Sequence, residues 1–328
     1  MDRRDFLLAA AGAPFALAFA PSALTSTRGG TPLAFVTADL ESHVAVLDLT
    51  TREVVRRVRT GPGPRSIEAV LARTGVVAHT EHGVVSLVDG VTSRVRAELE
   101  AFDEPRYTAV SPPRADPSAR PLAYVTDSAR EEVVVVDVEL ARVVSRVAVP
   151  GPARHISISP DGQTLWTSLG TKAARVAVLD ARSPRRPRLA RTFAPPFLAH
   201  DVGFAPDGEN VWVTSGSERR IAVYRSDGRR LLRVIDADAP PQHVTFVGAR
   251  VFVASGDDGT VRRHTVDGRL VGEAQVPIGS YNVTFGWRSV ITPSLGRGTL
   301  SILDTRGRVA AVRRIARAAH DACVLVGP

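Results

Sequence analysis

The sequence predicts an all-β protein, a seven-bladed β-propeller of four-stranded blades, and three observations carry this prediction. Short valine-rich segments recur along the 328-residue chain, and valine favours the pleated surface of strands. A related strand segment returns about every 40 residues, a period typical of propeller blades. Finally, 26 glycines and 23 prolines supply turns between many short strands. We therefore expect residues 31–328 to form one propeller domain.

The repeated segments are related to the pattern of an aromatic or aliphatic residue, then Val, then Thr. Seven copies of it span the chain, and their number sets the number of blades. The copies are Ala34–Thr37, Val77–Thr80, Ala123–Thr126, Thr164–Thr167, Val211–Thr214, Val251–Ala254 and Ser289–Thr292.

Four strands are expected in each unit, and the third copy shows them most clearly. The turn Ser159-Pro160-Asp161-Gly162, for example, has the residues that favour tight turns. We expect three strands of this blade at Leu122–Thr126, Val133–Val138 and Val143–Val149, and a strand at Arg154–Ser159 that opens the next blade.

The first copy lacks an inner strand of its own. Residues Ala319–Leu325, near the C-terminus, have the pattern of one. We expect this C-terminal strand to complete the first blade, which closes the ring and removes open sheet edges.

These repeats resemble the YVTN-repeat (YncE-like) β-propellers, which are related to lactonase-type and WD40-like propellers. The family signature is visible as Tyr124-Val125-Thr126, Val134-Val135-Val136-Asp137 and Ala153–Gly162. The resemblance covers nearly all of residues 31–328 and implies the propeller fold. It implies no single function, because the family includes enzymes, binding proteins and structural proteins.

Residues 1–30 are expected to be an export signal of the twin-arginine type with a flexible leader. Arg3-Arg4-Asp5-Phe6-Leu7 resembles the twin-arginine motif, and an apolar run continues to Ala20. The run is too short and too rich in alanine for a membrane span. We therefore expect an exported protein, periplasmic or secreted, with no transmembrane segment after the signal is removed.

The formal net charge of +8 does not indicate nucleic-acid binding. Lys172 is the single lysine among 42 basic residues, so the excess is arginine and reflects overall composition rather than a basic patch. Solvated outer edges are expected for the arginine pairs Arg56-Arg57, Arg219-Arg220, Arg229-Arg230, Arg262-Arg263 and Arg313-Arg314. Cys323 is the only cysteine, which excludes an intramolecular disulfide and a cysteine-based zinc site. We expect Cys323 to be a small core residue.

The inner strands of a propeller begin around the mouth of the central channel, where ligands usually bind. Aligning the seven inner strands places one residue pair from each blade at this mouth. Four of the eight histidines fall in the pairs, although strand packing requires none of these polar residues. The pairs therefore indicate either a ligand site or a solvated rim. They are Arg65-Ser66, Arg106-Tyr107, Arg154-His155, His200-Asp201, Gln242-His243, Tyr281-Asn282 and His320-Asp321.

Glu68 joins the candidate residues because the six equivalent positions hold small residues. Its carboxylate is expected to meet Arg65 or Arg106, or to face channel water. The three arginines come from successive blades and could bind a carboxylate or phosphate. The predicted ligand-binding residues are Arg65, Glu68, Arg106, Tyr107, Arg154, His155, His200, Asp201, His243, Tyr281, Asn282, His320 and Asp321.

No cofactor is predicted, and a metal ion at the channel mouth stays an open alternative. Neutral imidazoles and carboxylates from different blades could converge there, although no local spacing demands it. The candidate metal ligands are His200, His243, His320 and Asp321.

The sequence favours a non-catalytic propeller that binds a small anionic ligand or a protein partner through its channel-mouth face. It has no Gly-x-Ser-x-Gly elbow, phosphate-binding loop or dinucleotide fingerprint. A lactonase-like hydrolase or lyase acting on an anionic small molecule is the first alternative, and it requires a close His–carboxylate pair at the mouth. DNA binding is the second, although we do not expect a nucleic-acid partner. We expect a monomer.

Changing Arg3 and Arg4 together to Lys is expected to block export, because the twin-arginine route reads both arginines. The measurement is the amount of processed protein outside the cytoplasm. Undiminished export of the double-Lys protein would indicate an ordinary Sec signal instead.

Overall fold

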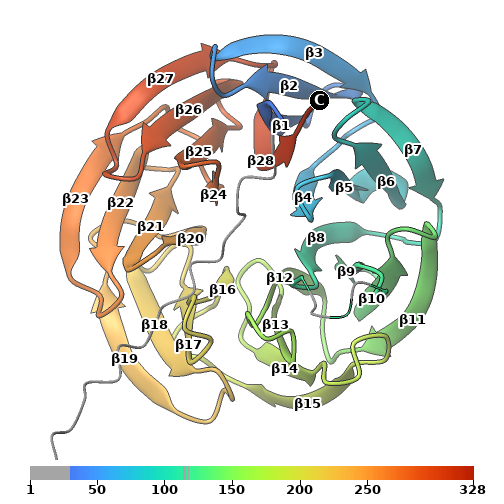
Figure 1. Cartoon of the computed structure of the whole chain (residues 1–328). Helices are drawn as coiled ribbons and strands as arrows, with labels where there is room; N and C mark the ends of the chain where they lie inside the picture. Colours follow the sequence, from blue (N-terminus) through green and yellow to red (C-terminus); the bar gives the residue numbers. More distant parts are fainter. Residues whose placement is uncertain (1–29, 114–115, 117) are drawn as a thin grey trace, which may run out of the picture.

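Seven antiparallel sheets stand like blades around a central axis (Figure 1) in the computed structural model, which describes residues 30–113, 116 and 118–328. Each sheet has four strands, which we call a to d from the axis outward. The predicted seven-bladed, four-stranded propeller is thereby confirmed. The predicted export segment lies, apart from Gly30, outside the described residues. No helix among the described residues is long and apolar enough to cross a membrane.

The strands of each blade run in order from a at the axis to d at the rim. Blade 1 has β28 (Ala319–Val326), β1 (Pro32–Ala38), β2 (His43–Asp48) and β3 (Glu53–Arg59). Blade 2 has β4 (Ser66–Val70), β5 (Thr74–His79), β6 (Val84–Asp89) and β7 (Arg94–Leu99), with the 3-10 helix η1 (Thr80–His82) between β5 and β6. Blade 3 has β8 (Pro105–Val110), β9 (Leu122–Asp127), β10 (Glu132–Asp137) and β11 (Arg142–Ala148).

The other four blades repeat this order. Blade 4 has β12 (Ala153–Ile158), β13 (Thr164–Leu169), β14 (Val176–Asp180) and β15 (Arg188–Phe193). Blade 5 has β16 (Val202–Phe204), β17 (Asn210–Thr214), β18 (Arg220–Arg225) and β19 (Leu231–Asp236). Blade 6 has β20 (Val244–Val247), β21 (Arg250–Ser255), β22 (Thr260–Thr265) and β23 (Leu270–Gln275). Blade 7 has β24 (Thr284–Gly286), β25 (Ser289–Ser294), β26 (Thr299–Asp304) and β27 (Val309–Arg314).

The b- and c-strands are buried on both faces because each blade packs between two neighbours. In β10 the four successive valines, residues 133–136, are all buried. An apolar run without alternation is typical of such a strand. The d-strands form the outer rim, and Arg56-Arg57 in β3 and Arg313-Arg314 in β27 are exposed there, as predicted. The same expectation is wrong for Arg262-Arg263, which lie in the c-strand β22, where Arg262 is buried and pairs with Glu273 at 2.8 Å.

The apolar core is divided among seven junctions between neighbouring blades. Between blades 1 and 2, Phe35 packs in one cluster with Ile67 and Val77. Similar clusters join the other neighbouring pairs of blades. Burying one large aliphatic or aromatic side chain stabilises the fold by about 1.5–3 kcal/mol. Because each cluster needs side chains from two blades, the ring has to close for every blade to be covered.

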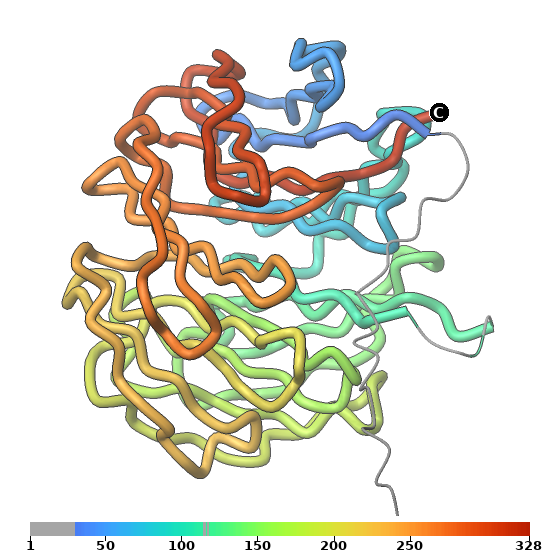
Figure 2. The backbone as a smooth tube through the Cα atoms, turned by 60° about the vertical axis from the view of Figure 1, so that its left-hand side comes forward, coloured from blue at the N-terminus to red at the C-terminus, as the bar shows by residue number. Residues whose placement is uncertain are grey.

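Strand β28 closes the ring as predicted. It pairs antiparallel with β1, with Cys323 opposite Phe35 and Leu325 opposite Leu33. Figures 1 and 2 show this C-terminal strand, in red, running beside the first strand, in blue. Cys323 is 3% exposed within the cluster of blades 1 and 2 and is the small core residue that the sequence indicated.

Deleting residues 319–328 is expected to abolish soluble folded protein, because it removes β28 and exposes the edge of β1. Soluble yield and cooperative thermal unfolding would be measured, with deletion of residues 327–328 alone as the control. A truncated protein that melts cooperatively near the parent temperature would contradict the role of β28.

Candidate functional site

The seven a-strands begin around one end of the central channel, and the polar pairs predicted from the sequence lie at or just before the start of each strand. A cavity of about 310 Å³ follows the channel at this end. Its walls include Glu68, Tyr107, His155, Asp201 and His243. Side chains from different blades thus face one shared space, as the propeller repeat predicted.

In three blades the residue pair sits on a β-bulge, where two residues of strand a oppose one residue of strand b. Arg154 and His155 together oppose Ser168. Bulges bend a strand and re-aim its side chains, and they are common beside functional sites. The other two bulges place Arg106-Tyr107 opposite Thr126 and His320-Asp321 opposite Thr37.

A hydroxyl group of strand b fills the gap that each bulge leaves in the ladder. Ser168 Oγ accepts a hydrogen bond from the N–H of His155 at 3.2 Å and donates one to the carbonyl oxygen of His200 in the next blade at 2.9 Å. The repeated Thr or Ser therefore fixes the backbone of the mouth. Three threonines make the same pair of contacts, in which the hydroxyl accepts from an N–H of its own blade and donates to a carbonyl oxygen of the next blade. Thr37 accepts from Asp321 and donates to Arg65, Thr126 accepts from Tyr107 and donates to Arg154, and Thr214 accepts from Asp201 and donates to Gln242.

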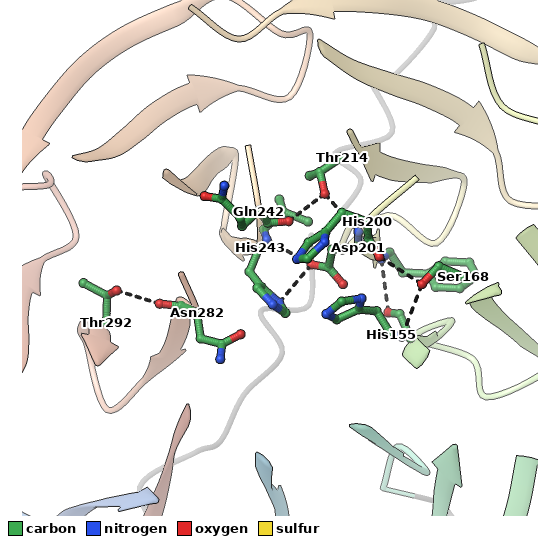
Figure 3. Close-up of polar contacts among 12 residues, drawn as sticks. His155, Ser168, His200, Asp201, Thr214, Gln242, His243, Asn282 and Thr292 are labelled. Atoms are coloured by element: carbon green, nitrogen blue, oxygen red, sulfur yellow. Dashed lines mark hydrogen bonds and ion pairs between the residues drawn. The ribbon is translucent and has the colours of Figure 1, made fainter. Parts of the chain in front are cut away.

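Three histidines from consecutive blades converge at the mouth (Figure 3). The ring centroids of His155 and His200 lie 4.4 Å apart, those of His155 and His243 4.7 Å, and those of His200 and His243 5.5 Å. One ring nitrogen of each lies within 4.8 Å of the other two, so this histidine triad could hold a metal ion.

His200 is held by loops of two blades. Its Nδ1 lies 3.2 Å from the carbonyl oxygen of Thr171, which comes from the loop between β13 and β14. On its other side lies Gly216, whose φ of +72° favours glycine. A Cβ at residue 216 would lie 2.8 Å from the Cβ of His200, so glycine also provides the necessary space.

The ring nitrogens of the other two histidines differ in their partners. His243 Nδ1 lies 3.4 Å from Asp201 Oδ2, and the His243 side chain is 12% exposed. This is the close His–carboxylate pair that the enzyme alternative requires. His155 is 1% exposed, and neither of its ring nitrogens has a hydrogen-bond partner among the described residues. A buried polar atom without a partner costs about 1–3 kcal/mol, so His155 is a candidate to contact a bound ion or small molecule.

Burial lowers the pKa of two imidazoles of the triad, those of His155 and His200. It holds the pKa of His155 well below the ordinary value, and the neighbouring His200 and His243 reinforce the effect. Burial, followed by the proximity of His243, lowers the pKa of His200 to about 4. Both rings are therefore neutral at pH 7, the form in which imidazole binds metals.

The predicted acidic residues have different roles. Asp201 Oδ2 accepts a hydrogen bond from the N–H of Val244 at 3.1 Å, and Asp321 Oδ2 accepts one from Ile67 at 3.0 Å, so both also connect neighbouring blades. Glu68 forms no ion pair with Arg65 or Arg106, and instead lines the channel cavity. Burial, together with the negative charge of Asp321, raises the pKa of Glu68 to about 8.

Of the three predicted arginines, two have acidic partners. Arg65 pairs with Asp39 at 3.1 Å, and Arg106 pairs with Glu104. Arg154 makes no ion pair or side-chain hydrogen bond within the described part of the chain, and its Cζ lies 6.0 Å from the ring centroid of Tyr107. Burial lowers the pKa of Arg154, and the charges of Arg106 and Arg65 act in the same direction.

The remaining predicted residues hold neighbouring blades together. His320 Nδ1 lies 2.7 Å from the carbonyl oxygen of Arg65, and Asn282 donates to the carbonyl oxygen of His320 at 2.7 Å. Tyr281 donates to Asp257 at 3.0 Å. The expectation that strand architecture explains none of the polar pairs is therefore wrong for these residues. Two of the four candidate metal ligands, His200 and His243, belong to the triad. The other two, His320 and Asp321, form hydrogen bonds elsewhere. The third member of the triad is His155, which was not among the four candidates.

The model of one protein family matches this chain in sequence. It is PQQ_2, described as outer membrane protein assembly factor BamB, and it matches residues 153–316, half of the chain. The chain belongs to this family. The PQQ_2 match spans blades 4 to 7 and so includes all three histidines of the triad. No curated protein matches the sequence.

Several solved structures share the fold. A functionally unknown protein from Desulfotomaculum acetoxidans DSM 771 is 14% identical, with a TM-score of 0.75 over 90% of this chain and 99% of that one. Hydrazine synthase of Kuenenia stuttgartiensis is 17% identical, with a TM-score of 0.71 over 83% and 92%. AztD of Citrobacter koseri is 11% identical, with a TM-score of 0.66 over 92% and 99%. These structures share the fold of this chain, and none of the comparisons names the YVTN-repeat family.

Glu68→Gln is expected to change how stability depends on pH. The fold favours protonated Glu68, whose pKa is about 8, whereas the unfolded chain ionises this carboxyl at its ordinary value, so stability falls as pH rises to about 8 and levels off above it. Between about pH 6.5 and about pH 8.5, the free energy of unfolding of the variant should fall by on the order of 1 kcal/mol less than that of the parent. The difference is smaller than the full pKa shift of Glu68 implies, because water in the channel screens its charge. The buried histidines whose pKa is lowered make stability rise with pH instead, but only below about pH 6.5, the ordinary pKa of the imidazole in the unfolded chain.

Denaturant unfolding across this pH range measures the effect, with Glu139→Gln at an exposed position as the matched control. Identical pH profiles for Glu68→Gln and the parent would show that Glu68 ionises normally in the fold.

Proposed function

We propose that this chain is an exported binding propeller whose channel mouth takes up a divalent transition-metal ion through His155, His200 and His243. The observation that carries the proposal is the convergence of three ring nitrogens within 4.8 Å of one another, from three consecutive blades. The binding face is the one that the sequence indicated, and the ligand is a cation bound by imidazole.

The contacts behind the triad support this role. Metal-binding histidines usually place their second ring nitrogen against a carboxylate or a backbone carbonyl, which fixes the ring and its tautomer. His243 has Asp201 in this position, and His200 has the carbonyl oxygen of Thr171. Both contacts use Nδ1, so Nε2 of each ring is left for a metal ion.

The chemistry of the donors selects the class of metal. Neutral imidazole suits zinc, copper, nickel and iron, whereas calcium and magnesium prefer oxygen ligands. Nitrogens bound to one zinc ion at about 2.0–2.1 Å lie roughly 3.4 Å apart in a tetrahedral site. Movements of about an ångström would bring the triad to this spacing, and His155 would gain the partner that it lacks among the described residues.

An extracytoplasmic location is part of the proposal. It is supported by the twin-arginine-like Arg3-Arg4-Asp5-Phe6-Leu7 and by the family description, which names an outer membrane protein assembly factor. Extracytoplasmic binding proteins meet metal ions before they enter the cell, and a site on the channel mouth is open to such exchange.

A second candidate function, metal-assisted hydrolysis of a lactone or ester, is favoured by the pair of His243 and Asp201. Three histidines with an open fourth position are also the arrangement of catalytic zinc sites. Turnover of a lactone and aryl-ester panel by the zinc-loaded protein, absent from the metal-free protein and from His155→Ala, would assign this activity.

Isothermal titration of the metal-free protein with Zn²⁺ is expected to show one ion bound per chain. His155→Ala and His243→Ala should each weaken binding at least about 100-fold, and Asp201→Asn about 10- to 100-fold, because a second contact orients its ligand. His82→Ala, an exposed histidine outside the triad, is the control and should bind like the parent.

Thermal melts without metal show whether each variant is folded. A metal ion at about 100 times its Kd should stabilise the parent by about 2.7 kcal/mol and leave His155→Ala unaffected. Parent-like zinc affinity in a folded double variant, His155→Ala with His243→Ala, would refute the proposed site.

A further inference from the structure

Three protein ligands leave one position open on a tetrahedral metal ion. Among the described residues, the group of converging ligand atoms consists of the three histidines only. The nearby carboxylates are engaged: Asp201 with Val244 and His243, and Asp321 with the N–H groups of Ile67 and Ala322. The described residues therefore supply three ligands, and the fourth position is open to a bound molecule.

Two unused polar groups lie on the same side of the triad. The Tyr107 ring centroid is 4.1 Å from that of His155 and 5.6 Å from that of His243. The Tyr107 hydroxyl makes no hydrogen bond within the described residues, although the side chain lines the cavity. Arg154 adjoins His155 in sequence and lies over the Tyr107 ring at 6.0 Å.

The chemistry of these two groups is that of an anion receptor. A phenol is protonated at neutral pH, so the Tyr107 hydroxyl can donate a hydrogen bond to an anion. Arg154 carries five N–H donors in a planar fork that fits carboxylate or phosphate, and it has no acidic partner in the described part of the chain. Its two neighbours, Arg65 and Arg106, are already paired with Asp39 and Glu104.

The balance of charge points the same way. A divalent ion on the triad and the Arg154 guanidinium would bring three positive charges together, and Asp201 offsets one of them. A carboxylate bound between the ion and Arg154 would offset one of the two remaining charges, a doubly charged phosphate would offset both, and either would satisfy the Tyr107 hydroxyl. A cavity of about 310 Å³ has room for such a ligand.

We infer that the propeller binds its metal ion together with a small oxyanion, a carboxylate or a phosphate, which takes the fourth metal position and is held by Arg154 and Tyr107. This inference rests on the proposed metal site. It assigns the ligand class of the mouth and gives the two unused groups beside the triad a role.

The test uses the full mature protein loaded with Co²⁺, whose visible spectrum reports the ligands of the metal. Formate and inorganic phosphate are titrated separately in anion-free buffer, so that the two arms distinguish a carboxylate from a phosphate. We expect at least one of them to change the spectrum saturably. Arg154→Gln should weaken this anion at least about 10-fold and Tyr107→Phe several-fold, while Co²⁺ affinity without anion stays within about 3-fold of the parent.

Arg229→Gln, which removes an exposed arginine from a turn of blade 5, is the matched control and should bind the anion like the parent. A Co²⁺-loaded protein whose spectrum ignores both anions, or an Arg154→Gln variant with parent-like anion affinity, would overturn the inference and leave the metal site intact. Failure of Co²⁺ and Zn²⁺ to bind the parent at all would overturn the proposed function and this inference with it.

Discussion

The structure of the channel mouth depends on side-chain hydroxyls that replace missing backbone hydrogen bonds between strands a and b. A bulge leaves a backbone N–H without its ladder partner, and a buried N–H has to be paired. Ser168, Thr126 and Thr37 accept these N–H groups, and each hydroxyl then donates to a carbonyl oxygen of the next blade. One short side chain therefore sets both the geometry of its own bulge and the position of the neighbouring strand.

Equivalent positions in the repeat nevertheless have different roles. Asp321 accepts a hydrogen bond from Ile67 at the junction that Thr37 already bridges, and Asn282 joins blade 7 to His320. Between blades 3 and 6 the hydroxyls of Thr126, Ser168 and Thr214 connect the blades. Tyr107, Arg154 and His155 make no side-chain hydrogen bond among the described residues, and the candidate site lies around them.

The fold could be predicted almost completely from the sequence, and the site only in part. The repeat period, the valine runs and the unmatched Ala319–Leu325 determine blade number and closure, because they depend on spacing alone. The expected strands of blade 3 differ from β9, β10 and β11 by one residue at their ends. The alignment of the repeats also grouped His155, His200 and His243, whose ring nitrogens converge in the structure, and their role in binding a ligand stays a prediction.

Aligning the repeats could not show which residues have partners. His320 and His243 occupy similar places in the repeat, yet one contacts the carbonyl oxygen of Arg65 and the other faces the channel cavity. That difference arises from contacts outside the repeat signature. Thr171 holds His200, and Asp39 and Glu104 neutralise two of the three arginines. The residues that make these contacts do not recur with the blade repeat, so the sequence pattern could not indicate them.

The bulge of blade 4 shows how a local irregularity can produce a site. In a regular strand, adjacent residues point to opposite faces, so Arg154 and His155 would not act together. Opposite Ser168 the two residues share one place in the ladder, and both reach the mouth region beside Tyr107. A candidate metal ligand, His155, and a candidate anion-binding group, Arg154, are therefore consecutive residues that can act at one site. The same bulge in blade 3 brings Tyr107 toward His155, so the combination of imidazole, phenol and guanidinium follows from the bulges rather than from the regular repeat.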